Sequence, residues 1–354
     1  MKKSFLITTG GSGGHVIPAL ILYEHLSKEA NVIITTDKRG LKYLDDEFYK
    51  CKIINTPRLD NILLLPFNMI KIIILTLKSL FLLKNKKVEK IFSTGGYMSL
   101  PLILAGKILK LEIFLLEPNQ VLGRSNKYFL SSCKKIFCYN KKIINFPKNL
   151  LNKMVIINPL VRENIYKFKS SGGIKDKFTI LIIGGSQSAS IFDMNLKNSI
   201  VNISKKKPIK IIQQTNKENV SYLKDFYSKN NIENKIFNFE NNFENIIKDA
   251  DLCITRSGAS TLAELSVINI PFIAVPLPTS KDNHQLENAN FYKENDCCWV
   301  IDQTNFEKKI EHLLSEILTD KIDYLKKKEN LKKLNYQNTW INVNQKILEI
   351  INEN

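Results

Sequence analysis

The stretch TTGGSGGHVIPAL, residues 8–20, follows the apolar run SFLIT (4–8) and leads into a segment with helical character. Four glycines and a serine form the turn, and His15 follows them directly. A glycine turn between a strand and a helix points backbone N–H groups at one spot, where the helix dipole also favours negative charge. The stretch therefore predicts a phosphate-binding turn. His15 is placed there as a general base or a diphosphate donor, with a hydrogen-bonded structural ring as the alternative.

The same turn begins like the dinucleotide fingerprint G-x-G-x-x-G at Gly11 and Gly13, but Val16 stands where the third glycine belongs. Asp37 lies roughly twenty residues further on, where a ribose-binding acid would lie. A nicotinamide- or flavin-dependent enzyme is weakened by the missing glycine, although it is not excluded.

Three more turns of this kind follow predicted strands. They lie in FSTGGYMSLPLILAGKIL (92–109), ILIIGGSQSASIFDMNL (180–196) and LCITRSGASTLAELSVINIPFIAVP (252–276). Any one of them would be weak support, but their recurrence over two predicted domains favours phosphate-bearing ligands gathered between the domains. Glu264 falls one turn into the last predicted helix. Its carboxylate could accept hydrogen bonds from the vicinal hydroxyls of a sugar, or simply favour the helix N-terminus.

Arginine occurs at only five positions, so Arg162 in NPLVREN and Arg256 in TRSG stand out. Lysine could supply bulk charge, whereas these positions could need the planar guanidinium fork; a structural salt bridge is the alternative. Two amide-rich loops, EPNQVLGRSNKYF (117–129) and KDNHQLENA (281–289), follow strands. Such loops suit sugar hydroxyls and amides, and they would also suit ordinary turns.

The chain has 354 residues and a formal net charge of +18, nearly all of it from lysine. The lysines are dispersed, which fits a biased genome with a solvated surface; a positive surface that attracts a bilayer, a nucleic acid or a phosphorylated substrate is the functional alternative. Nucleic-acid binding would call for aromatic residues interleaved with basic ones on one face, and it would leave the glycine turns unexplained. The composition therefore disfavours a nucleic-acid-binding module.

The six cysteines show neither CxxC pairing nor metal-ligand spacing with the four histidines. They are typical of reduced, packed thiols in a cytosolic protein. The N-terminal MKKSFLITTGG runs directly into the glycine turn, which does not fit a signal peptide. We expect a protein that stays in the cytoplasm.

Short apolar runs alternate with helical stretches along the whole chain, which predicts parallel sheets covered on both faces. The segment KFKSSGGIKDKF (167–178) is typical of a linker or exposed turn, after which the strand–turn–helix pattern begins again. The sequence therefore predicts an α/β protein with two doubly wound domains.

The segment NILLLPFNMIKIIILTLKSLFLLKNKKVEK (61–90) is long and apolar enough to suggest a membrane span. Lys71 and Lys78, seven residues apart, fall on one helical face, and a charge inside a span is expensive. Further lysines follow at the end of the segment. The pattern favours a helix lying in a bilayer interface beside anionic headgroups, with a buried crossover helix as the alternative.

The ordered motifs GGSGGHVIPAL, STGGYMSLP, EPNQVLGRSNK, NPLVR, GGSQSAS, TRSGASTLAEL and NHQLENA together resemble the MurG family of cell-wall N-acetylglucosaminyltransferases. The resemblance runs from residue 4 to about 303. That family transfers N-acetylglucosamine from its UDP donor to undecaprenyl-diphosphate-linked N-acetylmuramoyl-pentapeptide. It inverts the anomeric carbon and uses no metal or other cofactor.

The resemblance implies a GT-B fold, in which two Rossmann-like domains face a cleft. An N-terminal acceptor and membrane-associated domain would span residues 1–160, and a UDP-sugar-binding domain residues 161–335. A C-terminal helix over residues 336–354 would return to the first domain. The implied enzyme lies peripherally on the cytoplasmic face of the cell (inner) membrane, against an anionic surface.

The resemblance also implies the site. His15 would be the catalytic base, with Glu117 as the second candidate. Substrate would be bound by Ser12, Gly13, Gly14, Asn119, Arg162, Ser186, Glu240, Ala259, Ser260, Thr261, Leu262, Ala263, Glu264, Gln285 and Asn288. The first-domain residues would close on the donor and the acceptor diphosphate, and the helix start at 259–261 would hold the UDP diphosphate together with Ser186. Arg162 would cover the uracil and the Glu240 region would add backbone contacts. Glu264 would take the ribose hydroxyls, and Gln285 with Asn288 would read the sugar.

Three departures from the family pattern bear on these roles. Ser93 and Ser188 stand where glycines are expected, and the loop PLPTSKDNHQ is longer than in some members, which affects the assignment of Gln285. A UDP-sugar epimerase can share this two-domain fold and is the enzyme alternative. Such an epimerase would need neither the apolar helix nor a lipid acceptor.

Overall fold

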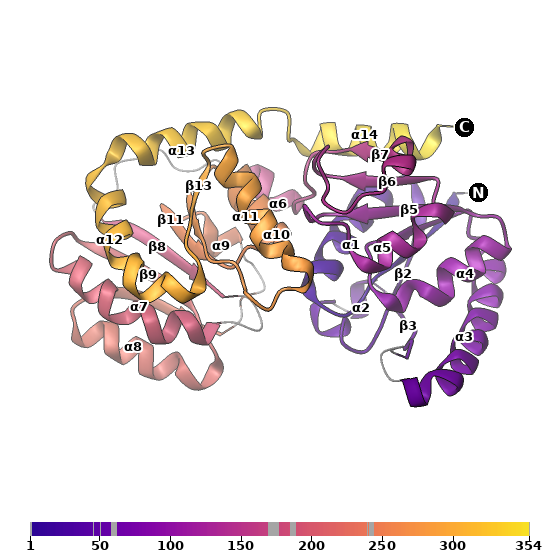
Figure 1. Cartoon of the computed structure of the whole chain (residues 1–354), viewed down its shortest axis with the longest axis horizontal. Coiled ribbons are helices and arrows are strands. Elements are labelled where there is room, and N and C mark those ends of the chain that lie inside the picture. The colour runs from indigo at the N-terminus through magenta and orange to yellow at the C-terminus, as the bar shows by residue number, and fades with distance from the viewer. Residues whose placement is uncertain are drawn as a thin grey trace. The chain divides into compact units, whose positions relative to one another are not determined.

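The computed structural model describes residues 2–44, 46–49, 51–57, 62–168, 177–184, 189–238, 240 and 244–353. The expected linker (167–178) and the GGSQS turn (184–188), which holds Ser186 and Ser188, lie mostly outside these ranges. The chain divides into two compact units (Figure 1). Unit 1 comprises Met1–Leu160 with Ile341–Asn354, and unit 2 comprises Val161–Trp340.

Unit 1 is built on a seven-stranded parallel sheet with the order β3-β2-β1-β4-β5-β6-β7. Its strands are β1 Lys3–Thr8, β2 Ala30–Thr36, β3 Lys52–Ile53, β4 Lys90–Ser93, β5 Glu112–Glu117, β6 Lys135–Cys138 and β7 Met154–Ile156. The chain order reverses between β1 and β4, so the carboxyl ends of these two strands border the topological switch point, where open α/β sheets bind ligands.

The helices of unit 1 are α1 Gly13–Leu26, α2 Asp46–Tyr49, α3 Leu65–Asn85, α4 Leu100–Ile108, α5 Arg124–Phe129 and α14 Trp340–Asn352. Helix α14 begins four residues later than the expected start at 336. Its residue Asn344 hydrogen-bonds His25 of α1. On one face of the sheet, Phe5, Phe92, Phe114 and Phe137 form a ladder across four neighbouring strands, with ring centroids 5.2 to 6.0 Å apart. Such cross-strand aromatic pairs stabilise the sheet.

Helix α3 has its polarity inverted. Its buried stripe comprises Asn68, Ile72, Thr76, Ser79 and Leu83, which recur at helical spacing and include three polar residues. Its solvent face is mostly apolar and includes Ile73, Leu77 and Phe81, the last 69% exposed, together with exposed Lys71 and Lys78. Helix α3 packs beside α4 at the edge of unit 1 (Figure 1). It is long and apolar enough to cross a membrane by length and composition.

Unit 2 has a six-stranded parallel sheet with the order β10-β9-β8-β11-β12-β13. The strands are β8 Phe178–Ile183, β9 Ile209–Gln214, β10 Glu233–Phe237, β11 Leu252–Thr255, β12 Phe272–Ala274 and β13 Cys298–Val300. The helices are α6 Glu163–Lys167, α7 Ala189–Ser204, α8 Val220–Lys229, α9 Glu244–Ile247, α10 Ala259–Val267, α11 His284–Glu294, α12 Phe306–Thr319 and α13 Lys321–Leu334.

Both faces of the second sheet are buried. Ile180 and Ile182 of β8 belong to one apolar cluster, whereas Leu181 and Ile183 belong to another. Because successive strand side chains point to opposite faces, helices must cover both sides of this sheet. The predicted α/β class, with two doubly wound Rossmann-like sheets, is confirmed.

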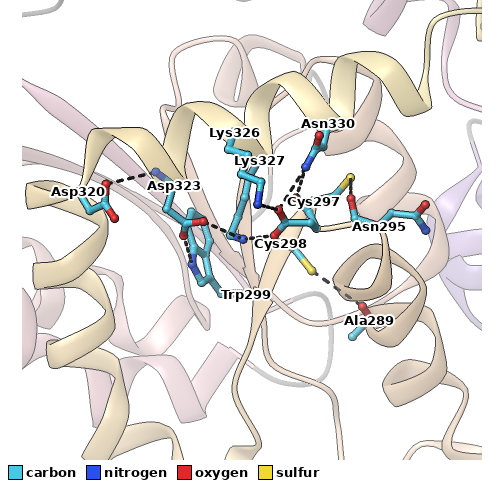
Figure 2. Close-up of polar contacts among 11 residues, drawn as sticks. Ala289, Asn295, Cys297, Cys298, Trp299, Asp320, Asp323, Lys326, Lys327 and Asn330 are labelled. Carbon is cyan, nitrogen blue, oxygen red and sulfur yellow. Dashed lines mark hydrogen bonds and ion pairs between the residues drawn. The ribbon is translucent and has the colours of Figure 1, made fainter.

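Within unit 2, a polar network joins α13 to Asp296 and to Trp299 of β13 (Figure 2). Asp296 lies in the turn between α11 and β13. Its carboxylate forms an ion pair with Lys326 and accepts hydrogen bonds from Lys327 and Asn330, all three on α13. The Trp299 indole donates to Asp323 at 3.0 Å. The two lysines lower the pKa of Asp296 through hydrogen bonding, so this carboxylate is charged at neutral pH.

Candidate functional site

Two glycine turns meet at the carboxyl edge of the first sheet. The first follows β1 and the second follows the neighbouring strand β4. The Thr94 hydroxyl donates to the Thr9 hydroxyl at 2.8 Å and links the turns directly. Gly10 and Gly96 both have positive φ angles, +152° and +89°, and a Cβ on Gly10 in the first turn would lie 3.1 Å from Cγ of Met98 in the second. Only glycine lets the two turns approach this closely.

His15 lies at the junction of the turns. Its Nδ1 is 2.8 Å from the Thr94 carbonyl oxygen. A carbonyl only accepts, so Nδ1 carries the proton of the neutral ring and Nε2 is the basic nitrogen. The ring also lies against Gly95, where a Cβ would be 3.2 Å from Cε1. This arrangement orients the imidazole and sets the tautomer that a general base requires.

Ser12, Gly13 and Gly14 form the start of α1 beside this ring. Ser12 is the N-cap residue, and its carbonyl accepts from the backbone N–H groups of His15 and Val16. Ser12 and Gly14 are exposed. The first backbone N–H groups of a helix have no partner within the helix, so this turn can bind an anion.

Glu117, the second candidate base, is buried at the end of β5 and is surrounded by donors. Its carboxylate accepts from the Gly123 backbone N–H at 2.7 Å and the Asn126 side-chain amide at 2.9 Å. Asn119 contributes both its backbone N–H and its side-chain amide, at 3.2 and 3.0 Å. These contacts fold the loop after β5 around the carboxylate, which favours an organising role for Glu117 over proton transfer.

Asp37 is equally committed to local structure. It accepts from the backbone N–H groups of Gly11 and Gly40 and from Arg39 Nε. Burial opposes ionisation, but these hydrogen bonds outweigh it and lower the pKa of Asp37. The residue at the position of a dinucleotide-binding acid therefore holds the glycine turn itself, which weighs further against a dinucleotide enzyme.

In unit 2, Arg162 and Glu264 form a pair. Arg162, the N-cap of α6, places Nε 3.4 Å from Oε1 of Glu264, one turn into α10. Burial raises the pKa of Glu264, and the Arg162 charge partly offsets this. Oε1 of Glu264 is buried, and among the described residues it accepts no hydrogen bond, because the contact with Arg162 is an ion pair without hydrogen-bond geometry. A buried carboxylate with unused accepting capacity suits a ligand hydroxyl.

The remaining residues of the α10 start divide by exposure. Ala259, Ser260 and Thr261 are partly exposed, whereas Leu262 and Ala263 are buried in the apolar core. The last two can meet a ligand only through their backbone. All five belong to the first turns of one helix, next to the carboxyl end of β11.

Gln285 and Asn288 of α11 support the turn before α10. The side-chain oxygen of Gln285 accepts from the backbone N–H groups of Ser257 and Leu277, at 3.2 and 3.0 Å. Asn288 is buried and donates to the Ser257 carbonyl at 3.1 Å. The Gln285 oxygen is therefore already committed, and its amide NH2 is the group suited to a sugar.

Three other residues complete the comparison with the sequence. Ser186 lies outside the described residues. Glu240 is partly buried, with a carboxylate oxygen 3.8 Å from Lys235 Nζ. Arg256 is buried. Its guanidinium donates to the carbonyls of Val275 and Pro276 and to Gln303 Oε1, which indicates a structural role.

Sequence reasoning did not single out Thr94 and Asn126, which position His15 and Glu117. Thr94 lies within the second glycine-turn motif and Asn126 within the amide-rich loop. Membership of those motifs was the only sequence signal for Thr94 and Asn126. Their contacts with His15 and Glu117 can be identified only once the order of the strands in the sheet is known.

Family models match both halves of the chain. The N-terminal domain model of glycosyltransferase family 28 matches residues 5–138, and the C-terminal domain model matches residues 179–339. Together these matches cover most of the chain.

Two curated relatives carry the name UDP-N-acetylglucosamine–N-acetylmuramyl-(pentapeptide) pyrophosphoryl-undecaprenol N-acetylglucosamine transferase. The one from Pelagibacter ubique (strain HTCC1062) is 48% identical and covers 100% of both chains. The one from Rickettsia canadensis (strain McKiel) is 38% identical over 91% of this chain and 92% of the relative.

Among solved structures, Acinetobacter baumannii MurG is similar with a TM-score of 0.78, 22% identity and 99% coverage of both chains. A UDP-GlcNAc 2-epimerase from Neisseria meningitidis is similar with a TM-score of 0.67 and 14% identity, over 99% of this chain and 100% of the epimerase. At these identities the likeness shows the fold alone, and the predicted GT-B class is confirmed.

Proposed function

Because the chain belongs to the MurG family within glycosyltransferase family 28, we infer that it transfers N-acetylglucosamine from UDP-N-acetylglucosamine to undecaprenyl-diphosphate-linked N-acetylmuramoyl-pentapeptide. The full-length identity of 48% to a relative named for this reaction carries the inference. Only a shared fold supports the epimerase alternative, since the sequence of this chain is 14% identical to that of the epimerase.

His15 is the proposed catalytic base. Its Nδ1–H donates to the Thr94 carbonyl, so the lone pair on Nε2 can take the proton of the acceptor hydroxyl. The hydroxyl oxygen then attacks the anomeric carbon from the face opposite UDP. The bond from that carbon to the phosphate oxygen breaks, and its electron pair leaves with UDP. Attack from the opposite face inverts the anomeric configuration.

The donor is proposed to bind mainly to unit 2. Backbone N–H groups at the start of α10 hold the UDP diphosphate and stabilise the charge that develops on leaving UDP, together with Ser186. Arg162 lies over the uracil, and backbone near Glu240 adds contacts. Glu264 accepts from the ribose hydroxyls, which its buried Oε1 supports. The Gln285 amide contacts the sugar while Asn288 holds the supporting turn.

Unit 1 is proposed to supply the acceptor side. The backbone of Ser12, Gly13 and Gly14 meets diphosphate, and Asn119 lines the site from the loop that Glu117 organises. No step of this mechanism needs a metal.

The apolar face of α3 is the proposed membrane contact. The polarity of this helix is inverted. Asn68, Thr76 and Ser79 are buried, whereas Ile73, Leu77 and Phe81 are exposed. An exposed apolar patch of this kind is unfavourable in water and marks an interaction surface. Exposed lysines at 71, 78, 84, 86 and 87 would meet anionic headgroups. We therefore place the enzyme peripherally on the cytoplasmic face of the cell (inner) membrane, beside its lipid-linked acceptor.

The test is transfer of radiolabelled N-acetylglucosamine from the UDP donor to a short-chain lipid-linked muramoyl-pentapeptide, with EDTA present. We expect labelled lipid product at a rate that EDTA does not change. Conversion of the nucleotide sugar in the absence of lipid would support the epimerase instead, and an untouched donor would refute both reactions.

A further inference from the structure

Arg39 lies beside the first glycine turn, at a position that neither the motifs nor the family matches single out. The Asp37 carboxylate joins the first glycine turn to the segment that carries Arg39, because it accepts hydrogen bonds from the backbone N–H groups of Gly11 and Gly40. The same carboxylate accepts from Arg39 Nε at 2.8 Å and lies 2.7 Å from Nη2. The guanidinium is thereby tied to the turn that it faces.

The second glycine turn holds the same side chain. Nη2 of Arg39 donates to the Tyr97 hydroxyl at 2.6 Å, and the guanidinium lies 5.3 Å from the centre of the Tyr97 ring. Tyr97 follows Gly95 and Gly96, whose positive φ angles bring this turn against the first. Arg39 therefore connects the two glycine turns of unit 1.

The donor count of the guanidinium leaves one edge for a ligand. An arginine has five N–H donors. Nε uses one on Asp37, and Nη2 uses its two on Asp37 and Tyr97. Within the described ranges no acceptor contacts Nη1. The side chain is 42% exposed, and a Cβ built on Gly11 would be only 3.6 Å from Nη2, so the guanidinium lies directly over the turn.

We propose that Arg39 binds the diphosphate of the lipid-linked acceptor through its Nη1 edge, next to the backbone N–H groups of the first glycine turn. This rests on the proposed function, which supplies an acceptor with a diphosphate. A planar fork held at two of its nitrogens is preorganised for phosphate oxygens, and lysine could not reproduce that arrangement. The Asp37 charge is shared among several donors, so it orients the arginine without occupying the free edge.

The same chemistry could come from the diphosphate of UDP, and the kinetics distinguish the two sources. We would measure KM for acceptor and for donor in Arg39→Gln, Arg39→Lys and the wild type. For Arg39→Gln we expect the acceptor KM to rise about tenfold or more, since a hydrogen bond to a charged group is lost. The donor KM should change less than about twofold. Arg39→Lys, which keeps the charge and loses the fork, should lie between.

Lys38→Gln is the matched control. Lys38 is exposed, adjacent in sequence and equal in charge; its backbone N–H donates to Asn55, and among the described residues its side chain makes no hydrogen bond or ion pair. It should leave both KM values unchanged, which separates specific contact from bulk charge. Tyr97→Phe removes the hydroxyl that accepts from Arg39 Nη2, and it should raise the acceptor KM by a smaller factor. This variant tests the proposal independently of how well Arg39→Gln folds.

Direct binding gives a readout that does not need turnover. A short-chain polyprenyl diphosphate should bind Arg39→Gln about tenfold more weakly than the wild type, with an equal melting temperature for the two proteins. An unchanged acceptor KM with unchanged probe binding would overturn the proposal, and a raised donor KM alone would assign Arg39 to UDP. A wild type without transfer would refute the proposed function, whereas the probe would still test Arg39.

Discussion

His15 and Thr94 join the two glycine turns of unit 1 through one hydrogen bond, from Nδ1 of the ring to the backbone carbonyl at 2.8 Å. Because the acceptor is a carbonyl, the bond sets the tautomer as well as the ring orientation. A second bond between Thr94 and Thr9 holds that carbonyl's own turn in place. The proposed base is therefore positioned by backbone and hydroxyl groups.

His15→Asn separates the two nitrogens of the ring. The asparagine amide can still donate to the Thr94 carbonyl, but nothing remains at the position of the basic Nε2. We expect kcat to fall by about 10²–10⁴-fold, the usual contribution of general base catalysis. UDP binding, measured by calorimetry, should stay unchanged. A kcat within threefold of the wild type would remove His15 as the base.

Glu117→Gln tests whether the second carboxylate organises its loop. A glutamine places an NH2 group among donors that the carboxylate now accepts from, at Gly123, Asn119 and Asn126. We expect the free energy of unfolding to drop by about 2–3 kcal/mol, because hydrogen bonds to a buried charge are lost. Urea denaturation measures this. Unchanged stability with a kcat lowered a hundredfold would instead make Glu117 the base.

Much of the fold was predictable because the apolar runs are long and the glycine turns separate them from helices. The apolar run SFLIT became β1, and the strands predicted before the three later glycine turns became β4, β8 and β11. The short strands β3, β6 and β13 were not predicted, and none of the quoted motifs contains them. A strand of two to four residues carries little pattern, and its partners decide whether it forms.

The site was predictable in its residues and not in its contacts. The turn motif pointed to His15, but its partner Thr94 follows another strand, and strand order cannot be read from one sequence. Asp37 stood where a ribose-binding acid would stand, yet its carboxylate holds the turn around Gly11. For Glu117, the loop that folds back over the carboxylate decides the role, and that folding depends on the Asn126 contact.

Glu264→Gln tests the donor site through pH. Burial raises the pKa of Glu264, so the carboxylate is protonated at a higher pH than an exposed glutamate. In the wild type, donor affinity should fall as the pH is lowered through this raised pKa, since the protonated group accepts more weakly. The variant should lose this acid limb and bind UDP about tenfold more weakly at neutral pH.

Arg162→Ala provides the complementary change. Removing the nearby cation raises the pKa of Glu264 further, so the acid limb should begin at a higher pH than in the wild type. The acceptor KM should stay constant in both variants. A pH profile of UDP binding that is identical in all three proteins would exclude Glu264 from the donor site.

The α3 face should bind anionic vesicles. Ile73→Gln combined with Leu77→Gln replaces two outward apolar side chains with good helix formers. We expect vesicle binding to weaken at least about tenfold, because burial of each side chain in lipid contributes roughly 1 kcal/mol. The melting temperature should not fall. Transfer to a short-chain acceptor in detergent should also continue.

Met194→Gln is the control for that experiment, since Met194 is an exposed apolar residue of unit 2. It should bind vesicles like the wild type. Sedimentation with vesicles of 30% anionic lipid, compared with neutral vesicles and with high salt, gives the measurement. Equal binding by all three proteins would rule out α3 as the contact.

His25 of α1 makes the stability of unit 1 depend on pH. The ring is fully buried against Asn344 of α14, and burial lowers its pKa to about 4. The unfolded chain takes up this proton near pH 6.5, whereas the folded chain does so only near pH 4. As the pH falls through this window the unfolded state binds more protons, so stability declines, by at most about 3 kcal/mol.

His25→Asn keeps a donor for the Asn344 oxygen and cannot titrate, so its free energy of unfolding should lose this slope between pH 6.5 and 4. His312→Asn removes an exposed histidine of α12 and should keep the wild-type slope. Urea denaturation at half-unit pH steps compares the three proteins. The difference between wild type and His25→Asn is the informative quantity, because other titrating groups cancel in it. Parallel curves would mean that water reaches the ring and that the contact between α1 and α14 opens without unfolding.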